Sequence, residues 1–194
     1  MDNEPHPTGG RGHRDSIRRH TRLLCMAAFL AALSFLLGLI AKMIQGAGPL
    51  RLTVEGMPVV FAGITMGPVV GAAVGATADL LSCLLAGQAP LPLITVGAAT
   101  VGVVSGVIPY FFRHGARRFG QAWPFPLVLL CDGAAHGLGS ILIKSFALAD
   151  FYGFNPLFFR ILIYLGVIAL ESYLLYALLR STAIRREIER LTRQ

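Results

Sequence analysis

The feature that most constrains this chain is the arrangement of its apolar residues in long runs with few charges. Some 55% of the residues are hydrophobic and 14% are charged, whereas soluble domains typically have about 45–50% apolar and about 25% charged residues. A run of roughly 20 apolar residues is long enough to cross the hydrocarbon core of a bilayer as a helix. The pattern therefore predicts an all-α, multi-pass membrane protein, and 194 residues leave room for one membrane domain.

Glycine and proline breaks divide the apolar sequence into six predicted transmembrane helices. The second of these is the least regular, because Gly56 and Pro58 lie near its start. Three regions follow: a disordered basic tail over 1–20, a six-helix membrane domain over 21–180, and a charged tail over 181–194. The helices are expected at about 23–44, 52–65, 68–85, 92–112, 125–146 and 156–179.

The positive charges indicate how these helices are oriented. Six spans place both termini on one side, and 13 of the 17 Lys and Arg residues then lie there (five before the first helix, three between helices 4 and 5, and five after the last). The positive-inside rule makes that side the cytoplasm and predicts a multi-pass cell-membrane protein. Because no aromatic residues are interleaved with the charge, nucleic-acid binding is not expected.

Two further patterns concern packing and buried charge. The first predicted helix carries Ala27, Ala28, Ala31 and Ala32, a small-residue stripe that favours close helix approach, either within the bundle or to a partner helix. Ionisable groups inside the apolar runs are costly in lipid, so they are expected to pair or to line a polar pathway. One such pair would be His136 with Glu171, and Asp132 precedes His136 by four residues. The full set is Asp79, Asp132, His136, Lys144, Arg160 and Glu171.

Cationic residues also gather at the predicted outer ends of the helices. Arg51, Lys144 and Arg160 are expected there with Tyr152 and Asn155. Cations in such a position suit an anionic solute arriving from outside. The alternative for each is that its charged group reaches the lipid phosphates. These five residues are the candidate substrate-binding set.

No pattern for catalysis, cofactors or metals stands out. The chain has no G-x-x-x-x-G-K-[ST], H-E-x-x-H or G-x-S-x-G motif. Its three cysteines, Cys25, Cys83 and Cys131, are scattered through apolar runs, which argues against both a disulfide framework and a zinc site. The sequence thus predicts neither an enzyme nor a metal or cofactor site, and any ATP hydrolysis that drives transport would belong to another subunit.

The stretch from Leu50 to Leu81 resembles the substrate-binding (S) components of energy-coupling-factor (ECF) vitamin transporters, most closely the folate-type ones. The last helix, from Asn155 to Leu179, is similar to the final helix of that family, with Arg160 near its start. Where folate-type members have an aromatic Pro-Gly-Phe loop, this chain has Gln88 to Leu93. The positions that match the family motif are Arg51, Pro58, Gly63, Gly67, Pro68, Gly71, Gly75 and Asp79.

The resemblance implies a six-helix S component that binds a vitamin from outside and works with a membrane-embedded T component and two cytoplasmic ATPases. It also implies that the alanine stripe of the first helix docks the T component, and that Arg51 and Arg160 contact the ligand. Folate or a related anionic vitamin is the expected substrate. The alternatives are another S-component substrate, such as pantothenate or a queuosine precursor, and a membrane scaffold that transports nothing.

Overall fold

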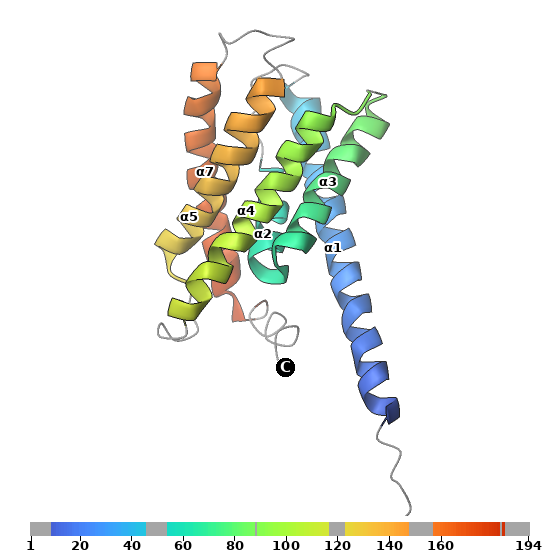
Figure 1. The fold of residues 1–194 in the computed structure, drawn as a ribbon. Coiled ribbons are helices and arrows are strands. Elements are labelled where there is room, and N and C mark those ends of the chain that lie inside the picture. Colours follow the sequence, from blue (N-terminus) through green and yellow to red (C-terminus); the bar gives the residue numbers. More distant parts are fainter. Residues whose placement is uncertain are drawn as a thin grey trace, which may run out of the picture.

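The computed structural model describes residues 9–45, 54–87, 89–116, 123–147, 157–182 and 184, which contain helices and no strands. Five helical stretches are long and apolar enough to cross a membrane, at His20–Ala41, Pro68–Leu85, Pro92–Phe112, Phe125–Ala147 and Ile161–Arg180. Five of the six predicted spans thus meet this criterion among the described residues, and the second corresponds to a shorter apolar helix, Met57–Met66. The elements are α1 (Gly9–Gln45), α2 (Met57–Met66), α3 (Pro68–Leu85), α4 (Pro92–Ala116), α5 (Phe125–Ala135), η1 (His136–Ile143) and α7 (Leu157–Arg180), as Figure 1 shows.

The first helix is longer than its apolar run. It begins at Gly9, so residues 9–20 are helical, and the expectation of a disordered tail over 1–20 is corrected for that part; residues 1–8 lie outside the described residues. In Figure 1 the first turns of α1 reach well beyond the ends of the other helices. Arginine is a good helix former, which helps a basic segment to continue a helix that the membrane-spanning part has already nucleated.

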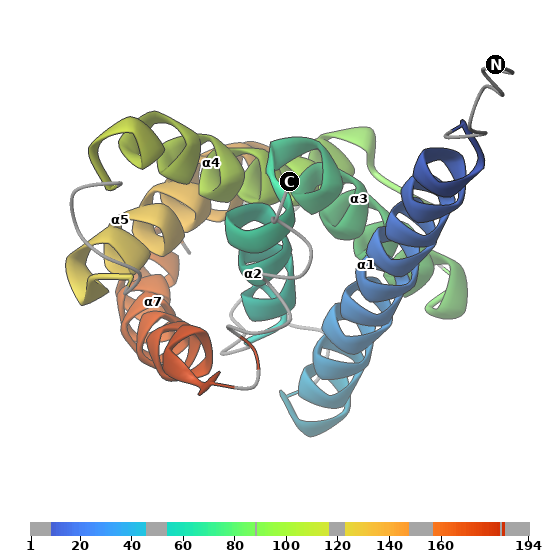
Figure 2. The same cartoon turned by 90° about the horizontal axis from the view of Figure 1, so that it is seen from below.

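The short helix α2 lies at the centre of the bundle. Seen along the helices in Figure 2, α2 is surrounded by α1, α3, α4, α5 and α7. Its start at Met57, later than the predicted residue 52, follows from Pro58, whose fixed φ suits the first helical turn. At its other end Gly67 has a φ of +97°, a conformation that favours glycine, and Pro68 then begins α3.

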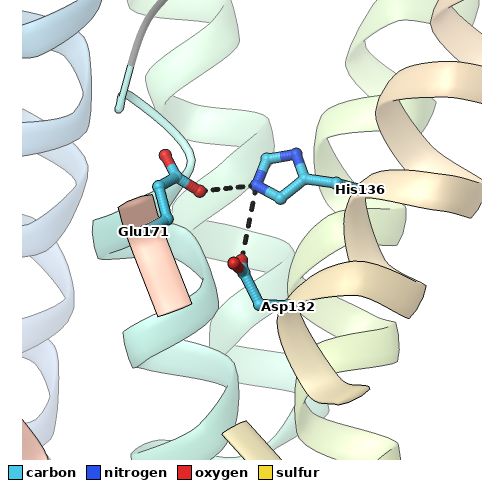
Figure 3. A group of neighbouring side chains, drawn as sticks. All are labelled: Asp132, His136 and Glu171. Atoms are coloured by element: carbon cyan, nitrogen blue, oxygen red, sulfur yellow. Dashed lines mark hydrogen bonds and ion pairs between the residues drawn. The ribbon is translucent and has the colours of Figure 1, made fainter. Parts of the chain in front are cut away.

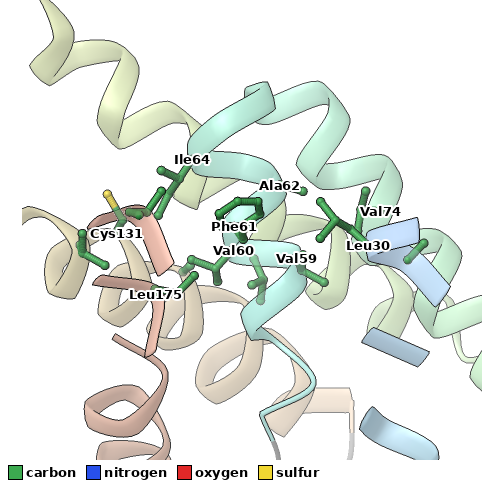
Figure 4. Packing of buried hydrophobic residues seen from close by; sticks show 14 residues of the cluster. Leu30, Val59, Val60, Phe61, Ala62, Ile64, Val74, Cys131 and Leu175 are labelled. Atoms are coloured by element: carbon green, nitrogen blue, oxygen red, sulfur yellow. The ribbon is translucent and has the colours of Figure 1, made fainter. Parts of the chain in front are cut away.

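The helix α2 contributes more buried apolar side chains to the core than any other helix. Val59, Val60, Phe61, Ala62 and Ile64 are buried there. In Figure 4 they pack against residues of α1, α3, α5 and α7, including Leu30, Val74, Cys131 and Leu175. Large apolar residues also remain exposed on the outer faces of the other helices, such as Phe111, Phe158 and Leu162. That distribution suits a bundle whose surroundings are lipid.

Glycines allow α2, α3 and α4 to pack backbone to backbone. A Cβ atom added at Gly71 would stand 2.6 Å from the Gly102 carbonyl oxygen and 2.7 Å from the Gly63 Cα atom. One added at Gly102 would collide with the Gly71 backbone in turn. Small residues four apart in α3, at Gly67, Gly71 and Gly75, permit this close approach, and the neighbouring helices are α2 and α4.

The helix ends fall into two groups. In Figure 1 the start of α1, the α2–α3 turn, the end of α4, the start of α5 and the end of α7 lie at one end of the bundle. The end of α1, the end of α3, the start of α4, the end of the α5–η1 helix and the start of α7 lie at the other. This alternation agrees with the predicted threading. Which end faces the cytoplasm stays a prediction from the charge distribution.

Candidate functional site

A cluster of three ionisable side chains lies in the interior of the bundle, between the α5–η1 helix and α7. Asp132 and His136 are four residues apart, so both point from the same face of their helix towards Glu171 on α7 (Figure 3). His136 Nε2 lies 2.7 Å from Glu171 Oε2 and 3.6 Å from Asp132 Oδ1. Asp132 and Glu171 are fully buried, and His136 is 3% exposed. The pairing of His136 with Glu171 predicted from the sequence is confirmed.

The remaining polar atoms of this cluster are held by hydrogen bonds from other groups. Ser172 donates to Asp132 Oδ2 at 2.8 Å, and the Met57 backbone N–H donates to Glu171 Oε1 at 3.1 Å. Ser140 Oγ is 3.1 Å from His136 Nδ1. Asp132 Oδ1 is buried and has no hydrogen-bond partner among the described residues. One polar atom of each residue therefore faces the centre of the cluster, while its other polar atom has a hydrogen-bond partner outside the cluster.

The start of α2 contributes to this site through its backbone. The first N–H groups of a helix have no partner within the helix and carry partial positive charge, which favours a carboxylate nearby. Glu171 occupies that position at Met57. Gly56 lies against the imidazole, because a Cβ atom there would stand 2.6 Å from His136 Nε2. A side chain at residue 56 would therefore displace His136 from its partner.

A π-helical segment begins at His136. It covers His136–Ile143, and the chain returns to α-helix at 144–147. At this segment Gly139 and Gly97 of α4 approach closely: a Cβ at Gly139 would be 2.6 Å from the Gly97 carbonyl oxygen. Segments of π-helix are rare and frequently mark functional sites. Nothing in the apolar pattern of residues 125–146 predicted it, because its signal is tertiary packing.

The arrangement can hold a proton or a cation between two carboxylates and an imidazole, inside a helical membrane bundle. A family model described as "ECF transporter, substrate-specific component" matches residues 22–184. The chain belongs to this family. No curated protein matches it. The protein is therefore a membrane-embedded substrate-binding subunit of an ECF transporter, of the kind that associates with T and ATPase components.

The candidate substrate-binding residues of this S component are only partly described. Lys144 lies just after η1 and is half-buried, with its stem running beside Gly97 of α4. Arg160 lies in the first turn of α7, and its side chain is outside the described part of the chain. Arg51, Tyr152 and Asn155 lie outside the described residues altogether. The end of the α5–η1 helix and the start of α7 lie at the same end of the bundle (Figure 1).

The alanine stripe of α1 divides into two pairs in this S component. Ala31 is 3% exposed and Ala27 packs against the core, so this pair faces the bundle. Ala28 and Ala32 are exposed. The expectation that all four share one face is corrected, since neighbouring residues of a helix are about 100° apart. The surface that stays available to a partner helix is the one that carries Ala28 and Ala32.

Three further polar residues have clear hydrogen-bond partners in the structure. Asp79 on α3 accepts a hydrogen bond of 2.6 Å from Thr95 on α4, which ties the two helices together near their connection. Ser140 and Ser172 contact the ionisable cluster, and no sequence pattern singled them out. Their only signal would have been position, one turn after His136 and next to Glu171.

Proposed function

We propose that this S component binds folate or a related anionic, ring-containing vitamin at the end of the bundle that carries Lys144 and Arg160. The vitamin then passes inward through a complex with a T component and two ATPases. This end faces the outside of a bacterial plasma membrane, and both termini are cytoplasmic. The motif from Leu50 to Leu81 supports a folate-type specificity.

The position of the cations carries the proposal. Lys144 directly follows η1, and Arg160 lies in the first turn of α7, the helix that packs against α5 and η1. Two cationic residues on neighbouring helices at one end of the bundle suit the carboxylates of a folate-like solute. Lys144 is half-buried beside α4 and is thereby positioned towards the bundle rather than wholly towards lipid.

The test is thermal unfolding of the detergent-purified protein with a panel of vitamins. A ligand that binds only the native state raises the stability by about 2.7 kcal/mol at a concentration a hundred times its dissociation constant. Folates should raise the melting temperature. A shift with pantothenate or a queuosine precursor alone would replace the substrate but keep the binding function. No shift with any vitamin, while a known vitamin-binding S component responds in parallel, would favour a scaffold instead.

Two substitutions on the same helix sharpen the test. Arg160→Gln should weaken binding of the anionic vitamin by roughly 10- to 100-fold, because a hydrogen bond to a charged group contributes about 1.5–3 kcal/mol. Arg180→Gln removes the same charge from the opposite end of α7 and should leave affinity unchanged. Equal affinities for the two variants would exclude Arg160 from the binding site.

A further inference from the structure

We propose that Asp132, His136 and Glu171 bind a divalent transition-metal ion inside the bundle. The proposal is independent of which vitamin the protein carries. It goes against the expectation from the sequence, which found no metal-binding spacing because the three ligands come from two helices far apart in the chain. The observations that carry it are the convergence of three ligand atoms, their outer hydrogen bonds and their charge.

The three facing atoms are close enough to share one ion. Asp132 Oδ1, His136 Nε2 and Glu171 Oε2 lie within 4.8 Å of one another. Ligand bonds of about 2.0–2.1 Å in a tetrahedral site place neighbouring ligand atoms about 3.3 Å apart. The 3.6 Å separation of Nε2 from Asp132 Oδ1 is near that value, and the 2.7 Å separation from Glu171 Oε2 must open by about 0.6 Å. Small side-chain rotations suffice for this change.

Each ligand already has the outer hydrogen bond that metal sites use to orient their ligands. Metal-bound histidines usually donate their second ring N–H to a neighbouring group, and bound carboxylates are hydrogen-bonded in turn. Here Ser140 faces His136 Nδ1, Ser172 donates to Asp132 and the Met57 N–H donates to Glu171. When the ion is bound, Nδ1–H donates to Ser140 Oγ and the Nε2 lone pair faces the metal. Without the ion, Nε2–H donates to Glu171.

The negative charge of the two carboxylates favours binding of a cation. Two ionised carboxylates with a neutral imidazole carry two negative charges, and a buried unpaired charge is strongly unfavourable in a membrane. No lysine or arginine is among the buried side chains of the described residues. The nearest lysine along the helix is Lys144, which is only half-buried. Asp132 Oδ1, which is fully enclosed and has no hydrogen-bond partner in the described part, points into the centre (Figure 3). A divalent cation neutralises the cluster.

The ligand set of one imidazole nitrogen and two carboxylate oxygens indicates the class of metal. Imidazole suits zinc, iron, copper and nickel, and carboxylate extends the range to manganese. The three protein ligands leave a fourth position for water or a solute group, as in open zinc sites. Zn²⁺ is the appropriate first probe, and Co²⁺ is its spectroscopic substitute.

The experiment measures zinc on the full-length, untagged protein in detergent. The protein is stripped with a chelator, equilibrated with Zn²⁺, gel-filtered and analysed for bound metal, with affinities from calorimetry. The wild type should retain one Zn²⁺ per chain. Asp132→Asn and Glu171→Gln should each lower the affinity at least tenfold, and Ser172→Ala by roughly 10- to 100-fold through its effect on Asp132.

Two controls exclude other zinc ligands. Asp79→Asn removes a carboxylate of the same membrane domain and should bind zinc like the wild type. The chain also has four histidines outside the cluster, so a variant with His6, His13, His20 and His114 replaced by Gln should likewise keep its zinc. Loss of the ion from either control, or unchanged affinity in Asp132→Asn, would overturn the proposal.

A measurement on the wild type covers the case in which a cluster variant does not fold. Co²⁺ bound by a nitrogen and two oxygens in four-coordinate geometry gives an intense visible absorption band. A molar excess of Zn²⁺ should displace the Co²⁺ and abolish this band. A wild-type protein that folds and retains neither Zn²⁺ nor Co²⁺ would show that protons, and not a metal ion, neutralise the cluster. The metal site would then be rejected.

Discussion

The glycine contact between α2, α3 and α4 allows a quantitative prediction about Gly71→Ala. The new methyl group would meet the Gly102 carbonyl oxygen at 2.6 Å and Gly63 Cα at 2.7 Å. Since ordinary contacts begin near 3.4 Å, both backbones must recede by about 0.7–0.8 Å. Neither neighbour is a side chain that can rotate away, so the helices themselves have to separate.

The expected cost follows from that separation. A gap of 0.5–1 Å already forfeits a quarter to a half of the dispersion attraction between the facing atoms. Overpacking a close-packed interior usually destabilises by about 1–3 kcal/mol. Because the new methyl group meets backbone atoms of two helices, the cost of Gly71→Ala should lie at the upper end of this range. The better helix propensity of alanine offsets up to about 1 kcal/mol of that cost. A net loss of about 2 kcal/mol in the free energy of unfolding is therefore predicted.

Gly166→Ala provides the matched control, because Gly166 lies in α7 and nothing stands within 4 Å of a Cβ atom there. It should be neutral or stabilising by up to about 1 kcal/mol. Reversible unfolding of both variants in mixed micelles, followed by helical circular dichroism, measures the difference. If Gly71→Ala is as stable as Gly166→Ala, the backbone contact between these helices does not exist as described.

Two further predictions concern the hydrogen bond between α3 and α4 and the exposed face of α1. Thr95→Val removes the hydroxyl that donates to Asp79 and should lower the free energy of unfolding by about 1.5–3 kcal/mol in the same micelle assay. Thr100→Val is the control, because the Thr100 hydroxyl is exposed and bonded within its own helix. This control should change the free energy of unfolding by under about 0.5 kcal/mol. Ala28→Leu with Ala32→Leu should preserve vitamin binding in detergent but abolish uptake by cells, because larger side chains keep a partner helix away. Normal uptake by this double variant would exclude the exposed alanine pair as a docking surface.

The features that could be predicted from the sequence are those with local causes. The bounds of α3 follow from Gly67 and Pro68, which fix the turn and the first helical residues, and the structure places them as expected. The spans beginning near Pro92 and Phe125 were predicted equally well, since length and apolarity determine them. Even the contact of His136 with Glu171 was foreseen, because two ionisable groups buried in lipid require partners.

The features that escaped prediction depend on how the helices meet. The helix α2 covers Met57–Met66 and is too short to cross a membrane, although its composition is strongly apolar. The π-helical segment at His136 has no local sequence signal, and the approach of Gly97 to Gly139 becomes visible only in three dimensions. In the same way, the split of the α1 alanines between bundle and surface depends on the rotation of that helix about its axis, which a stripe of small residues does not fix.

The glycine packing also limits how this S component can change shape. Where backbones touch, as at Gly63, Gly71 and Gly102, sliding by a fraction of an ångström produces collisions, so α2, α3 and α4 must move as one rigid body. The outer helices α1 and α7 meet the rest of the bundle mainly through side chains, which tolerate small shear displacements. Any opening that admits a solute must therefore leave α2, α3 and α4 together and displace the helices around them instead.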